Sequence, residues 1–124
     1  MSERLAAELK ETPGMALWCG TRLECLSALS RRRREGTLNS TKADTARKVL
    51  ADLGREALIV APLPDVWDRA ERLLEVHPLN AADAMQLASA LAWCQERPQG
   101  RVFTCLDGKL REAARREGFR LFPE

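Results

Sequence analysis

The chain lacks the features by which membrane and secreted proteins are recognised. No apolar run among its 124 residues approaches the roughly 20 residues that a membrane-spanning helix needs. The opening residues, MSERLAAELK, carry charges that no apolar stretch follows, and this pattern argues against a signal peptide. We therefore expect a cytoplasmic protein that does not use a membrane as a partner.

Motifs for nucleotide binding and for covalent catalysis are also absent. The sequence contains no GxxxxGKS/T, GxGxxG or GxSxG, so neither a phosphate loop nor a serine nucleophile elbow is expected. The only histidine, His77, precedes Pro78 at an expected helix end, which favours a surface or turn position. No CxxC pair and no zinc spacing occur, which favours buried reduced thiols for the four cysteines: Cys19, Cys25, Cys94 and Cys105.

The composition that remains is that of an ordinary globular protein. With 45% hydrophobic and 31% charged residues, the chain can form one hydrophobic core, and we expect a single domain over residues 1–124. The net charge of +2 is too small to indicate a nucleic-acid-binding protein. Basic residues nevertheless gather in RRRR, Arg31 to Arg34, and in REAARR, which ends at Arg116. Such runs are usually solvated helix faces, but Arg31 to Arg34 and Lys109 are also candidate phosphate contacts.

Helical and extended patterns alternate along the chain. Helices are predicted over 2–11, from an N-cap at Thr21 to Gly36, over 38–54, from Pro64 to His77, from an N-cap at Asn80 to about Gln95, and from an N-cap at Asp107 to Gly118. Strands are predicted at 15–19 and 57–61, both buried, and at 101–105 and 119–122. This alternation indicates an α/β fold with a mostly parallel sheet, whose sites lie beyond the carboxyl ends of the strands.

Three acidic residues lie near that edge of the predicted sheet. Glu24 follows the first strand by five residues, Asp107 follows the third strand closely, and Asp83 lies in the first turn of the apolar helix LNAADAMQLASAL. Each acid also fits a purely structural role. Thr21 and Glu24 form a possible capping box, Asp83 follows Asn80 where the helix dipole favours an acid, and Asp107 is a good N-cap.

Taken together, the three acids point to a bound cation. Clustered carboxylates raise one another's pKa unless a cation lies among them, and carboxylate oxygens suit Mg²⁺ or Mn²⁺. A metal in such a site polarises a phosphoryl oxygen and lowers the pKa of a bound water. The pattern therefore predicts phosphodiester hydrolysis, with Glu24, Asp83 and Asp107 as the catalytic metal ligands.

The same segments resemble a known family. LNAADAMQLASAL and RVFTCLDGKLREAARREGFRLFPE resemble the carboxyl half of PIN-domain proteins, in particular the VapC-type ribonuclease toxins, and TRLECLSAL resembles their acid-bearing second motif. The resemblance implies a three-layer α/β/α fold in which Glu24, Asp83 and Asp107 hold Mg²⁺ or Mn²⁺ and a water is activated to cut RNA. It also implies a small antitoxin protein as a partner and a homodimer. Thr104 and Cys105 match the family's Ser or Thr near the last acid only loosely, and we leave them out of the catalytic set.

The chain departs from the family at its first motif. PIN domains usually begin with a central strand that ends in an Asp, their first metal ligand, whereas MSERLAAELK resembles the helix after that strand and no Asp precedes Asp44. Three explanations stay open: a start codon assigned too late or a truncated chain, a natural remnant that closes the gap or dimerises, and a different family. We expect this 124-residue chain to be a poor nuclease.

Two other functions are weighed against the nuclease. A non-catalytic PIN-like interaction module would bind an antitoxin or form a dimer through the leucine-rich helix over residues 23–29 and residues 40–53. Core packing is the ordinary role of most of those leucines. A nucleotide-binding α/β domain of another kind is disfavoured because the sequence has no glycine-rich phosphate loop.

Overall fold

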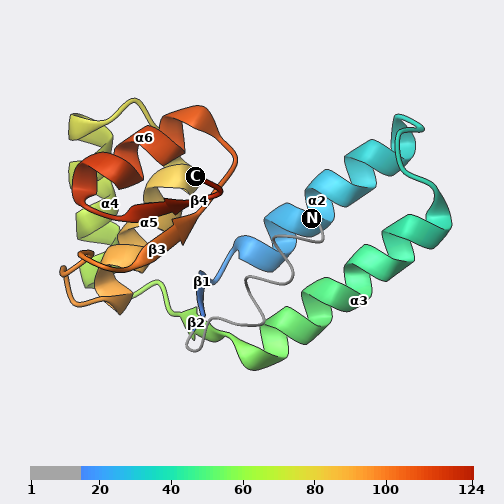
Figure 1. The fold of residues 1–124 in the computed structure, drawn as a ribbon, viewed down its shortest axis with the longest axis horizontal. Coiled ribbons are helices and arrows are strands. Elements are labelled where there is room, and N and C mark those ends of the chain that lie inside the picture. The colour runs from blue at the N-terminus through green and yellow to red at the C-terminus, as the bar shows by residue number, and fades with distance from the viewer. Residues whose placement is uncertain (1–14) are drawn as a thin grey trace. The chain divides into compact units, whose positions relative to one another are not determined.

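The computed structural model describes residues 15–124, so the helix predicted over 2–11 lies outside the described residues. Figure 1 shows the elements of this part of the chain, which are β1 Ala16–Trp18, α2 Thr21–Arg34, α3 Ser40–Glu56, β2 Leu58–Val60, α4 Pro64–Val76, α5 Ala81–Trp93, β3 Val102–Thr104, α6 Gly108–Glu117 and β4 Arg120–Phe122. The predicted mixed α/β class is confirmed. The chain divides into two compact units, one ending at Ile59 and the other spanning Val60–Glu124.

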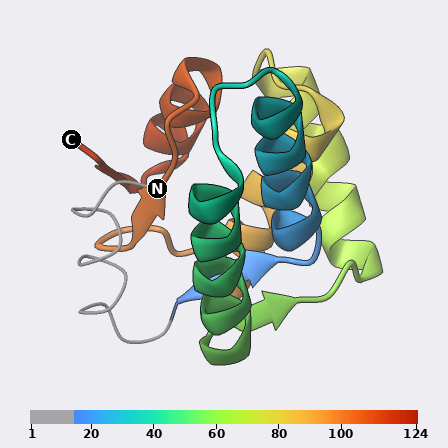
Figure 2. The ribbon, with the colours of Figure 1, turned by 90° about the vertical axis from the view of Figure 1, so that its right-hand side faces the viewer.

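The first unit consists of a short two-stranded sheet and a helical hairpin. β1 and β2 are neighbours in the sheet, and the Leu58 N–H donates to the Met15 carbonyl at 2.9 Å. Figures 1 and 2 show α2 and α3 side by side. As predicted, α2 ends before Gly36, which has a positive φ of 78°. α3 begins at Asn39, whose side chain accepts from the Lys42 N–H at 2.8 Å.

Three local predictions in this unit are wrong. The N-cap of α2 is Gly20, so Thr21 is already helical and no side chain caps the helix. α3 continues past Gly54 to Glu56, because Gly54 does not adopt the positive φ that ends a helix. The strand predicted to be buried at 57–61 is instead exposed, at 58% for Leu58 and 47% for Ile59. A two-stranded sheet is too small to cover both faces of its strands.

The second unit contains the hydrophobic core. α5 buries six residues, and four leucines of the unit are fully buried: Leu73, Leu87, Leu91 and Leu110. β3 and β4 pair in parallel, with Phe103 opposite Leu121, and α6 connects them. The rings of Phe103 and Phe119 lie 5.5 Å apart and close one end of the core. The parallel pairing is confirmed for β3 and β4, but the described strands form two separate two-stranded sheets rather than one.

His77 links α4 to α6 inside the second unit. It caps the carboxyl end of α4, so the predicted turn position at a helix end is confirmed, whereas its side chain is only 3% exposed and does not lie on the surface. Its Nε2 lies 2.7 Å from Glu117 Oε2, and Glu117 Oε1 accepts from Arg69 Nη2 at 3.2 Å. The polar ring is buried because these groups satisfy it.

Among residues 15–124, every helix is too short or too polar to cross a lipid bilayer.

Candidate functional site

Asp83 is positioned by the first turn of α5. The Asn80 side chain accepts from the Asp83 N–H at 2.8 Å, which confirms Asn80 as the N-cap and fixes where the Asp83 backbone lies. The following residues, Ala84 and Met85, are buried, so Asp83 sits half-buried at the border between the core and solvent. The apolar helix α5 thus carries one carboxylate in its first turn.

Asp107 is positioned by the first turn of α6. Its Oδ1 accepts from the Leu110 N–H at 2.9 Å, so the predicted N-cap is confirmed. The other carboxylate oxygen, Oδ2, has no hydrogen bond from any residue that the structure describes. One oxygen therefore stabilises the helix and the other is available for a ligand.

Asp83 and Asp107 act on each other electrostatically. Burial raises the pKa of Asp83, and the negative charge of Asp107 raises it further. Such a shift means that the pair is destabilised when both groups are ionised, and a cation between them would remove that cost. The structure therefore brings together two of the three predicted acids.

Cys105 lies beside the same two acids and was left out by sequence reasoning. Its Sγ accepts from the Asp107 N–H at 3.2 Å. Burial is the main cause that raises the pKa of this thiol, and the charges of Asp107 and Asp83 add to it, so the thiol stays protonated at neutral pH. Arg111 Nη1 donates to the Cys105 carbonyl at 2.9 Å and holds the end of β3 to α6. Cys105 lies two residues before Asp107, the N-cap of α6. This position in the sequence is the signal that could have identified Cys105 as a neighbour of the acid.

Glu24, the third predicted acid, lies in the first turn of α2 in the other unit. Its backbone N–H donates to the Gly20 carbonyl at 3.0 Å, and its charge helps to raise the pKa of the neighbouring Cys25 thiol after burial. The predicted capping box is wrong, because Thr21 is not the N-cap of α2. The membership of Glu24 in one site with Asp83 and Asp107 stays a prediction.

No group of three or more His, Cys, Asp or Glu side chains within residues 15–124 is arranged to hold a metal ion. The pair Asp83 and Asp107 supplies two carboxylates, which is fewer protein ligands than the predicted set of three.

The four cysteines are free thiols, as predicted, but they are not all buried. Cys94 is buried, Cys25 and Cys105 are half-buried, and Cys19 is exposed.

A comparison of the sequence with models of protein families gave no match, and neither did a comparison with curated proteins.

Proposed function

We propose that this chain is a PIN-like, metal-dependent endoribonuclease of the VapC toxin type, and that its activity is weak. The observation that carries the proposal is the electrostatic coupling of Asp83 and Asp107 at the starts of two adjacent helices. Two carboxylates whose charges act on each other, one of them with an oxygen that forms no hydrogen bond within residues 15–124, are suited to a shared hard cation.

The chemistry of the donor set fits Mg²⁺ or Mn²⁺. Asp83 and the Oδ2 of Asp107 would hold the ion, with Glu24 as the further ligand that the family resemblance implies. Bound there, the ion would polarise a phosphoryl oxygen of RNA and lower the pKa of a water. The residues of the chain contribute by fixing the two carboxylates through helix caps, so that little reorganisation is needed on binding.

The proposed weakness of the activity follows from the small number of ligands. No group of three or more His, Cys, Asp or Glu side chains within residues 15–124 is arranged to hold a metal ion. The pair Asp83 and Asp107 supplies two carboxylates, and a site with so few protein ligands should bind its metal weakly.

Calorimetric titration with Mn²⁺ tests the metal site. We expect the wild-type chain to bind Mn²⁺, and the variants D83N and D107N to lose that binding. Asn can retain the cap at position 107 while it removes the charge. The matched control is D65N, which changes an exposed acid in the first turn of α4 and should bind as the wild type does. Absence of Mn²⁺ binding in the wild type would contradict the proposal.

Cleavage of a labelled single-stranded RNA tests the reaction. We expect slow, Mn²⁺-dependent cleavage that EDTA and D83N abolish. Rapid cleavage by the 124-residue chain would contradict the proposed weakness of the site, and cleavage that survives both EDTA and D83N would contradict the metal-dependent mechanism.

One observation favours a non-catalytic interaction module as the second candidate. Large apolar side chains are exposed on the first unit, at 74% for Leu23 and 58% for Leu58. Exposed apolar side chains that form one contiguous patch commonly mark a protein contact. An antitoxin or a second copy of the chain would cover it. Co-purification of a small protein encoded beside this gene, together with no Mn²⁺ binding, would favour the module over the nuclease.

A further inference from the structure

Three arginines and a serine surround an open hollow on the helical hairpin of the first unit. Ser30, Arg33 and Arg34 come from the end of α2, and Arg47 comes from α3. The hollow has a volume of about 310 Å³. Because α2 and α3 pack against each other within one unit, the hollow is a feature of that unit alone.

The positive charge at this hollow is largely uncompensated. No carboxylate among residues 15–124 forms an ion pair with Arg33 or Arg34. Arg47 is partly paired, since its Nη1 lies 3.5 Å from Asp44 Oδ1 on the same helix. The carboxyl end of α2 carries the negative pole of the helix dipole, which helps the helix to tolerate this many cations.

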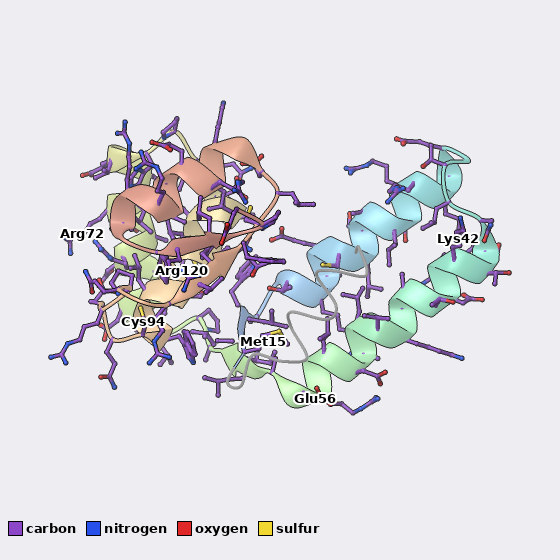
Figure 3. All side chains as sticks on the ribbon, viewed as in Figure 1. Met15, Lys42, Glu56, Arg72, Cys94 and Arg120 are labelled. Atoms are coloured by element: carbon purple, nitrogen blue, oxygen red, sulfur yellow. The ribbon has the colours of Figure 1, made fainter. Side chains whose placement is uncertain are left out.

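Figure 3 labels Lys42, which lies in the first turn of α3, near the end of the hairpin where the two helices are joined. Lys42 also forms no ion pair within the part of the chain that the structure describes. Lys42 does not line the hollow, but it adds a positive charge at the same end of the hairpin. A polyanion that approaches this end of the hairpin therefore meets several unpaired cations.

The hollow separates two arginines of the basic run from the other two. Arg33 and Arg34 line it, whereas Arg31 and Arg32 do not, although all four are exposed and consecutive on α2. Guanidinium groups that converge from two helices can grip the oxygens of one phosphate with paired hydrogen bonds, and a serine hydroxyl can donate another. Arg33 and Arg34 of α2 line the hollow together with Arg47 of α3, an arrangement that a single solvated helix face does not provide.

We infer that this hollow binds the phosphate backbone of a single-stranded RNA. The identity of the polymer rests on the proposed function, while the phosphate chemistry rests on the four residues around the hollow. The hollow would hold a stretch of the strand through its backbone and would make no choice among base sequences.

Fluorescence anisotropy with a labelled single-stranded RNA tests the inference on the full chain. The titrations are done in EDTA, so that neither cleavage nor a bound metal contributes. We expect R33A/R34A to weaken binding by about tenfold or more at low salt, and to lower the slope of log K against log salt by about 1.4, which corresponds to two lost phosphate contacts. R47A should weaken binding less, because Asp44 already shares its charge.

The matched control is R31A/R32A, which removes the same charge from the same helix. We expect this variant to lose about threefold or less and to keep most of the salt slope. R33K/R34K keeps the charge but loses the fork geometry, and its affinity should fall between those of the wild type and R33A/R34A. Equal losses in R33A/R34A and R31A/R32A would overturn the inference, because general charge rather than the hollow would then explain binding.

Competition with AMP distinguishes an RNA strand from a small phosphate compound. We expect AMP to displace the RNA only at concentrations far above those at which unlabelled RNA does so. Displacement by AMP and by RNA at equal phosphate concentrations would overturn the assignment to a strand. Binding of RNA in EDTA tests the hollow, and calorimetric titration with Mn²⁺ tests the metal site, so failure of the metal site and failure of the hollow are separate results.

Discussion

The second unit and the first unit are stabilised in different ways. The second unit buries four leucines completely, and side-chain caps start both α5 and α6. In the first unit, α2 and α3 together bury only Ala43, and all four arginines at the end of α2 are exposed. The proposed metal ligands Asp83 and Asp107 lie on the well-packed unit, which suits carboxylates that must be held in place to share a cation. The arginines of the proposed phosphate contact lie on the unit whose helices bury little side-chain surface.

The largest expected change in the free energy of unfolding comes from a substitution in the core of the second unit. L87A removes a side chain with no exposed surface and should lower the free energy of unfolding by about 2–5 kcal/mol. The control is L23A, which truncates a leucine of α2 that is 74% exposed and should change stability by about 0.5 kcal/mol or less. Urea unfolding curves measure both. Similar losses in the two variants would mean that the units do not differ in packing.

The polar link between α4 and α6 should have the next largest effect. E117Q weakens the hydrogen bonds to His77 and Arg69, and we expect a loss of about 1–3 kcal/mol in the same unfolding experiment. Glu96 pairs with Arg69 at 2.7 Å, but its side chain is 51% exposed. E96Q is therefore the control and should cost about 0.5 kcal/mol or less. An E117Q variant as stable as the wild type would show that the buried histidine needs no carboxylate.

The smallest effect concerns the acid pair. Because burial and then Asp107 raise the pKa of Asp83, the folded chain binds a proton there more tightly than the unfolded chain does. The stability that this provides is complete below the ordinary Asp83 pKa of 3.8 and is lost as the pH rises through the higher folded value. D83N avoids the loss, so in EDTA at neutral pH it should melt at a slightly higher temperature than the wild type.

Two controls accompany the melting experiment. The advantage of D83N should shrink as the pH is lowered toward the ordinary aspartate pKa, where both chains are neutral at this position. D65N, which changes an acid in the first turn of α4, should show no such change of its melting temperature relative to the wild type. A D83N variant that is less stable than the wild type at every pH would contradict the coupling of the two acids.

Most elements of the second unit could be predicted because their boundaries are set by local chemistry. Asn80 and Asp107 accept hydrogen bonds from N–H groups three residues later, and Gly118 ends α6 with a φ of 110° that side chains avoid. These interactions involve neighbours in the sequence, so the sequence alone reveals them.

Burial could not be predicted in the same way, because it depends on distant parts of the chain. The buried His77 contacts Glu117, which lies forty residues away in the sequence. The residues next to His77 give no indication of that contact. Leu58 and Ile59 belong to an apolar strand, yet among residues 15–124 only β1 pairs with it, and both residues stay exposed. An apolar pattern indicates which residues favour burial and does not show whether a covering element exists.

The candidate site shows the same limit. Asp83 and Asp107 were found from their positions at helix starts, and the structure brings their charges together. Cys105 was left out because it matches the family's Ser or Thr only loosely, and its contact with the Asp107 N–H depends on the turn between β3 and α6. The run Arg31 to Arg34 looks uniform in the sequence, and only the packing of α3 against α2 separates the two arginines that line the hollow from the two that do not.

The divided use of Asp107 has a consequence for how this gene can change. One oxygen of the side chain caps α6 while the other remains unbonded within the described residues, and asparagine can perform the first task without the charge needed for the second. Under the proposed function, a single nucleotide change from Asp to Asn would then yield a protein that folds normally and lacks the proposed metal site. An intact fold would therefore be no guide to whether a given copy of the gene keeps that site.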